Sequence, residues 1–112
     1  MKNPGGSRDF FLLIYLEYYS MKKLFLIHLG YSDDINGGVF EQHTNIFVVA
    51  DDFDSAQLVA KRIPIVIEKK MHIDGMQLIE KVEGFDIVLT KSNGKETNIV
   101  NRNYGELTKG KQ

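Results

Sequence analysis

Residues 23–31, with the sequence KLFLIHLGY, constrain the fold of this chain more than any other stretch. Apolar side chains fill both sets of alternating positions between residues 24 and 29, and only His28 interrupts them. A strand with one side in water alternates apolar and polar residues, so this pattern instead predicts an interior β-strand that is covered on both faces. The chain is therefore expected to build a sheet around this segment.

A second strand is predicted at residues 45–52, NIFVVADD, where β-branched residues dominate. Ile46 and Val48 fall on one face, and Phe47 and Val49 fall on the other. The two strands are expected to pair with each other. Between them, residues 32–43 are rich in Asp, Asn and Gly, which predicts a long surface loop.

Residues 53–64 carry the start and stop signals of a helix. Asp54 or Ser55 can cap the free backbone amides, and Phe53 occupies the position of a hydrophobic staple. Pro64 lacks an amide hydrogen, so the helix should end or kink near Ile63. The apolar positions form one stripe that is expected to lie on the sheet: Ala56, Val59, Ala60 and Ile63. The following residues, 65–70, fit a strand or a second helical segment equally well.

The second half of the chain predicts a hairpin. Residues 76–82 and 85–89 both alternate in polarity, and Glu83 and Gly84 between them suit a tight turn. Residues 92–95, SNGK, predict another turn, after which residues 97–104 are a candidate for a last edge strand. The expected fold is α+β, a small antiparallel β-sheet in β-β-α-β-β order with one main helix packed on a face.

Composition excludes several classes of protein. The 112 residues are 43% apolar and 26% charged, which is typical of one small globular domain. The absence of cysteine excludes disulfides, a thiolate nucleophile and a cysteine zinc site. A net charge of −1 gives no field that would gather nucleic acid or an anionic membrane. No apolar stretch reaches the roughly 18 residues that a spanning helix needs, so a cytoplasmic location is expected.

The chain divides into three parts. Residues 1–20 are interpreted as an N-terminal extension upstream of the true start, because Met21 opens MKKLFLIHLGY. A genuine appended helix and a secretory signal are the alternatives for the apolar residues 10–19. Residues 21–105 are expected to form the single α+β domain, and residues 106–112 a polar tail.

The three histidines are the first candidates for chemistry, because histidine is a general base near neutral pH and a common metal ligand. His28 is expected to be a core histidine if its face packs against the helix. His43 and His72 are expected at an edge of the sheet, near Glu41 and Asp74. These four residues predict either a metal or acid–base cluster, or hydrogen bonds that anchor loops to strand-end amides. Their spacing matches no recognised zinc pattern, so no metal or cofactor is assigned.

A family resemblance follows from four stretches in order: KLFLIHLGY, FEQHTNIFVVADDFDSAQLVAKR, MHID and VEGFDIVL. Together, over about residues 22–90, they resemble a group of small bacterial proteins known as domain of unknown function 1543. The matching positions are Leu29-Gly30, Glu41 with His43, Val48-Val49-Ala50, and His72-Ile73-Asp74. The sequence departs from the family pattern at Tyr31, where a second glycine is expected, at Gln42, and at Pro64. The family has no assigned activity, so the resemblance implies an architecture.

The resemblance also implies an oligomeric state. Many relatives look like two copies of this unit in tandem, whereas this chain holds one. A single copy with an exposed sheet edge or apolar patch can complete itself with a second chain, so we expect a homodimer.

The function expected from these observations is that of a non-enzymatic binding module that dimerises. It would bind a protein partner or a small ligand, and neither nucleic acid nor membrane, through a rim of loops carried by the sheet. The candidate rim residues are Tyr31, Glu41, His43, His72 and Asp74. The alternative is a small metal-dependent or acid–base hydrolase that uses His43, His72, Glu41 and Asp74.

Overall fold

The computed structural model of the chain describes residues 9, 11–12 and 21–109. The interpretation of residues 1–20 as an extension therefore lies mostly outside the described residues, as does the end of the predicted tail. Within the described part, no helix combines the length and the apolar character needed to cross a membrane.

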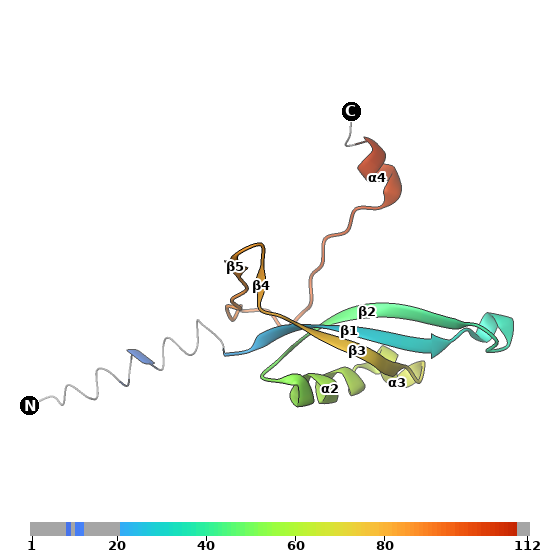
Figure 1. Cartoon of the computed structure of the whole chain (residues 1–112), viewed down its shortest axis with the longest axis horizontal. Helices are drawn as coiled ribbons and strands as arrows, with labels where there is room; N and C mark the ends of the chain where they lie inside the picture. Colours follow the sequence, from blue (N-terminus) through green and yellow to red (C-terminus); the bar gives the residue numbers. More distant parts are fainter. Residues whose placement is uncertain (1–8, 10, 13–20, 110–112) are drawn as a thin grey trace, which may run out of the picture.

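The centre of the fold is a three-stranded antiparallel sheet in the order β2-β1-β3 (Figure 1). Its strands are β1 (Lys23–Ser32), β2 (Glu41–Ala50) and β3 (His72–Ile79). The apolar segment at residues 23–31 is thus the interior strand, as predicted, and it pairs with the strand that follows it. The predicted α+β class with an antiparallel sheet is confirmed.

Two helices cover one face of this sheet: α2 (Phe53–Lys61) and α3 (Pro64–Glu68) (Figure 1). Three fully buried side chains of β1 form the centre of the core, and they are Phe25, Ile27 and Leu29. Ala56 and Ala60 of α2 pack there with no exposed surface. Their small size lets the helix backbone lie close to the sheet. Val59, predicted in the same stripe, is instead 40% exposed.

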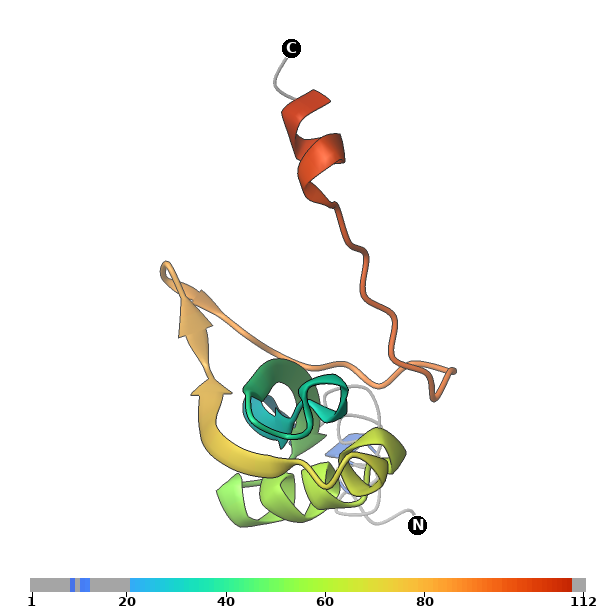
Figure 2. The same cartoon turned by 90° about the vertical axis from the view of Figure 1, so that its right-hand side faces the viewer.

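The prediction that β1 is covered on both faces is wrong for the described residues. His28 is exposed, and Leu24 and Leu26 are only half-buried, although they alternate with the three buried residues. Figure 2 shows both helices on one side of the sheet. We call the other side the open face. His28 lies there and is therefore not a core histidine.

The residue that caps α2 lies two residues before Asp54, the earlier of the two predicted caps. The Asp52 carboxylate, rather than Asp54 or Ser55, accepts a hydrogen bond from the Ser55 amide at 2.8 Å and caps the helix. Phe53 opens the helix and packs edge-on against Phe25, with ring centroids 5.2 Å apart. Pro64 takes the first position of α3, where its missing amide costs nothing, so the ambiguous residues 65–68 are helical.

The loop between β1 and β2 is shorter than predicted. Both strands continue until Ser32 pairs with Glu41, and a 3-10 turn, η1 (Asp34–Asn36), closes the connection. Glu41 and His43 consequently belong to a strand. Polar residues are tolerated in this part of β2 because Glu41, Gln42 and His43 are exposed to solvent.

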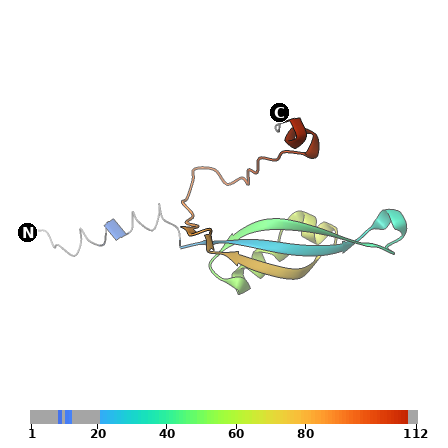
Figure 3. The ribbon, with the colours of Figure 1, turned by 45° about the horizontal axis from the view of Figure 1, so that its top comes forward.

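The predicted turn at Glu83 and Gly84 is present, and both residues have positive φ, 49° and 85°. It joins two short strands, β4 (Lys81–Val82) and β5 (Phe85–Asp86). These strands pair only with each other, so the prediction that residues 85–89 join the main sheet is wrong. In Figure 3 the hairpin stands at one end of the sheet.

Residues 97–104 form no strand, contrary to the edge-strand prediction, and they lead to a short helix, α4 (Tyr104–Lys109). The segment that follows β5 crosses on the side of the sheet opposite the helices (Figure 2).

Candidate functional site

The site is built around Gly30, the residue of β1 that lies between two histidines. His43 of β2 is its register partner on one side, and His72 of β3 is its partner on the other. Register partners in neighbouring strands point to the same face of a sheet, so both imidazoles lie on the open face. The Gly30 backbone between them carries no side chain.

Two carboxylates lie beside the imidazoles, because residues two positions apart in a strand point to the same face. Glu41 lies two residues before His43, and Asp74 lies two residues after His72. His72 Nε2 is 2.8 Å from Glu41 Oε1 and 3.1 Å from Asp74 Oδ1. His43 Nδ1 is 3.2 Å from Asp74 Oδ2, and His43 Nε2 is 3.4 Å from Glu41 Oε2. We call Glu41, His43, His72 and Asp74 the cluster.

A bulge in β3 gives Asp74 its place. His28 pairs with Gly75 and Leu29 with Ile73, so Asp74 is the extra residue opposite β1. The bulge lets both Ile73 and Met76 pack against the core, although an unbroken alternation would send them to opposite faces. Asp74 is left on the open face beside His72.

Gly30 is required at the centre for steric reasons. A Cβ atom there would lie 2.6 Å from Asp74 Oδ2, 2.7 Å from His72 Nε2 and 3.0 Å from Glu41 Oε1. Three polar atoms from two different strands therefore crowd one point above the Gly30 backbone. Any side chain at this position would displace the cluster.

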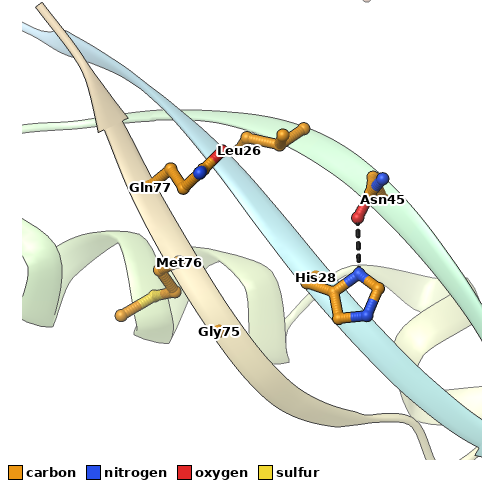
Figure 4. A pocket seen from close by; sticks show the side chains of 6 residues that line it. All are labelled: Leu26, His28, Asn45, Gly75, Met76 and Gln77. Atoms are coloured by element: carbon orange, nitrogen blue, oxygen red, sulfur yellow. Dashed lines mark hydrogen bonds between the residues drawn. The ribbon is translucent and has the colours of Figure 1, made fainter.

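Two neighbouring side chains on the open face, His28 and Asn45, support His43. Its ring stacks on that of His28, with centroids 5.0 Å apart and planes inclined by only 2°. His28 Nδ1 in turn lies 2.7 Å from Asn45 Oδ1 (Figure 4). His28 and Asn45 are register partners in neighbouring strands, one step along the sheet from the cluster.

The cluster is open to solvent. The exposed fraction of its side chains ranges from 30% for Asp74 to 55% for His72. Ion pairs at this level of exposure contribute little to folding stability, typically about 0–1 kcal/mol. The convergence of four ionisable groups therefore has no large effect on the fold and points to binding or chemistry.

A hollow of about 390 Å³ adjoins the cluster on the open face. Its lining residues come from all three strands and are Leu26, His28, Asn45, Gly75, Met76 and Gln77 (Figure 4). It meets the cluster through His28, which stacks on His43, and through Gly75, which follows Asp74. A bound molecule can therefore touch both the polar cluster and a partly apolar surface.

The structure brings together four of the five candidate residues named from the sequence. Tyr31 does not join them, because it points to the helix side of β1, where Lys69 Nζ lies 5.3 Å from the centre of its ring. His28 and Asn45 were not predicted to take part. The sequence could have indicated His28, because it lies two residues from Gly30 in the same strand and therefore points to the same face.

Residues 38–89 contain all four members of the cluster, and this same range agrees with a known family profile. These residues match Domain of Unknown Function (DUF1543). The resemblance predicted from the sequence is thus confirmed over this range. The DUF1543 match runs from the end of the β1–β2 connection through β5, and so includes the strands that carry the cluster. Comparisons with curated proteins and with solved structures gave no significant match.

Proposed function

We propose that this domain is a non-enzymatic, homodimeric module that binds a small ligand on the open face of its sheet. The cluster holds a cationic or hydrogen-donating group of the ligand, and the adjoining hollow accommodates the rest of it. The observation that carries this proposal is the convergence of four ionisable side chains from two strands beside Gly30, three of which place a polar atom within 3.0 Å of its Cβ position. Functional sites are commonly formed by a few polar groups that converge beside an apolar surface.

An acid–base hydrolase is the second candidate, and the imidazole–carboxylate contacts favour it. His43 with Asp74, and His72 with Glu41, have the geometry of a base and its orienting group. The four side chains nevertheless stand open to water, whereas catalytic electrostatics gain strength in a site that excludes it. The geometry therefore supports binding better than catalysis.

Two features support the homodimer. In the three-stranded sheet β2 and β3 are the outer strands, which leaves backbone groups on their outer sides. Phe47 and Val49 on the open face of β2 are 46% and 49% exposed. A second copy on this apolar part of the sheet would remove their side chains from water and leave the polar cluster accessible.

The binding surface is tested by screening a fragment library against the ¹⁵N-labelled full chain by NMR, in buffer with a chelator that removes metal ions. We expect amide shifts to concentrate at residues 41–45, 72–77 and 28–30. Asp74→Asn should abolish the shifts caused by cationic fragments, because it removes one of the two charges. Asp86→Asn, a change of the same type on the β4–β5 hairpin, should leave them unaltered.

Shifts that concentrate elsewhere, or that survive Asp74→Asn, would exclude the cluster as the ligand site. Fragments that fail to bind anywhere on the domain would count against a small-ligand module altogether.

A further inference from the structure

We propose that the point above Gly30 is a binding site for a divalent first-row transition-metal ion, with Glu41, His72 and Asp74 as its protein ligands. The inference rests on the same cluster as the proposed function and specifies the occupant of its polar part. The sequence left a metal cluster open as one alternative and assigned no ion, whereas the geometry identifies three ligands and a class of ion.

The three donor groups already have the mutual spacing of metal ligands. One ligand atom from each of Glu41, His72 and Asp74 can be chosen so that all three lie within 4.8 Å of one another. His72 Nε2 is 2.8 Å and 3.1 Å from the two carboxylate oxygens that it faces. Bonds of about 2.1 Å to one ion place adjacent ligand atoms about 3.0–3.4 Å apart, depending on the coordination geometry. An ion can therefore be bound with only small side-chain adjustments.

Charge favours a cation at this point. A neutral imidazole nitrogen carries at most one hydrogen, so His72 Nε2 cannot satisfy both carboxylates equally well. With neutral imidazoles, Glu41 and Asp74 place two negative charges close together on one small area of the sheet. A divalent ion compensates both charges and also accepts the lone pair of His72 Nε2.

His43 acts as a positioning residue for the carboxylates. A neutral His43 has a single N–H and donates it to one carboxylate, either to Asp74 Oδ2, 3.2 Å from its Nδ1, or to Glu41 Oε2, 3.4 Å from its Nε2. The other oxygen of each carboxylate faces His72. Groups that hold the ligands of a metal in this way orient them and raise the affinity of the site. The stacked His28 ring restricts the movement of His43, and Asn45 restricts His28.

The donor types determine the class of ion. Two carboxylates with one imidazole suit ions from Mn²⁺ to Zn²⁺, whereas Ca²⁺ and Mg²⁺ prefer oxygen donors alone and Cu⁺ prefers sulfur. Three protein ligands leave at least one coordination position of such an ion open. The cluster is open to solvent and adjoins the hollow, so a bound ion can anchor a ligand whose remainder lies in the hollow.

The test is a zinc titration of the metal-free full chain, measured by competition with a chromophoric chelator. The wild type should bind one Zn²⁺ per chain. His43→Ala should weaken binding about 10- to 100-fold, the usual effect of losing an orienting group. His72→Ala and Asp74→Asn should weaken it further, because each removes a direct ligand. Asp86→Asn should bind as the wild type does, and circular dichroism verifies the fold of every variant.

Gly30→Ala provides a variant that keeps every donor. The added methyl group meets only the flexible ends of three side chains, so the strand should remain folded while the donors are forced apart. We expect its zinc affinity to fall at least as much as that of His43→Ala.

The proposal is overturned if the wild type takes up no zinc, or if His72→Ala and Gly30→Ala bind zinc as tightly as the wild type. This failure is distinct from failure of the proposed function. Fragment binding at the cluster together with no zinc uptake would retain the binding module and reject the metal site. Zinc uptake with no fragment binding would retain the metal site and reject the small-ligand module.

Discussion

Gly30 shows how a single small residue organises a site. His43 and His72 are its register partners on either side, and any residue other than glycine at position 30 would place a side chain between them. Three polar side-chain atoms instead occupy the space within 3.0 Å of the missing Cβ. The requirement for glycine is therefore steric, and it arises from the open face rather than from the backbone angles of the strand.

Asp52 gives a prediction at the same scale. The hydrogen bond from the Ser55 amide lowers the pKa of the Asp52 carboxyl below 3.8, with further help from the Ser55 side chain and from Lys23 and Lys22. A carboxyl whose pKa is lower in the folded state stabilises the fold above its unfolded pKa, and this stabilisation is lost as pH falls through the folded pKa. Asp52→Ala should therefore lower the melting temperature at pH 7 by a few degrees.

The same substitution should have progressively less effect in acid, well below pH 3.8, because protonation removes the charge in the wild type as well. Thermal denaturation followed by circular dichroism at several pH values measures this. Asp54→Ala, in the first turn of the same helix, is the matched control and should cost less. An Asp52→Ala effect that is independent of pH would show that the ionised carboxyl does not stabilise the helix start.

At the scale of elements, the sequence predicted what depends on local apolar patterns. The interior strand, its partner and the main helix were all expected. Their signals were a nearly continuous apolar run in residues 23–31, β-branched residues in 46–50 and three- to four-residue apolar spacing in 56–63. The first residues of β2 were assigned to a loop. Glu41 and His43 face the open side, where no apolar period marks a strand.

Other differences arise from contacts that are distant in sequence. The bulge at Asp74 is set by the pairing of β3 with β1, and the alternation of residues 76–82 alone does not reveal it. Residues 85–89 alternate as a strand would, yet the tight turn at Glu83 and Gly84 leads them back along β4 and away from the main sheet. Alternation indicates a strand without identifying its partner.

The sequence predicted which residues form the candidate site but not how they are arranged. Glu41, His43, His72 and Asp74 were named from residue type and proximity to strand ends, and they lie together. Their meeting point depends on the strand order β2-β1-β3, which sequence patterns do not contain. Tyr31 was included because it precedes the loop, but the parity of β1 places it on the helix side.

At the scale of the whole molecule, the sheet has one face covered by helices and one face with a polar and an apolar part. The cluster lies toward the end of the sheet where Ser32 pairs with Glu41, and the apolar part includes Phe47 and Val49. Residues 95–99 of the C-terminal segment line a separate hollow with this apolar part. The proposed function assigns ligand binding to the polar part and self-association to the apolar part.

The proposed homodimer gives a prediction. Light scattering coupled to size-exclusion chromatography should give a mass of about 26 kDa, twice the 12.8 kDa of one chain. Phe47→Lys should shift the protein toward monomer, because it places a charge in the buried contact. Ile35→Lys, at a loop position that is 93% exposed, should leave the mass unchanged. A monomer at high micromolar concentration would refute the dimer without affecting the cluster.

Both imidazoles and both carboxylates meet beside Gly30, and the proposed site depends above all on this meeting. The most direct measurement is an NMR comparison of the histidine ring resonances in metal-free wild type and Gly30→Ala. Our structure predicts that one added methyl group shifts the ring signals of both His43 and His72, while the amide signals of α2 remain in place. Unchanged ring signals in a folded Gly30→Ala variant would show that these side chains do not meet there, and would contradict the account.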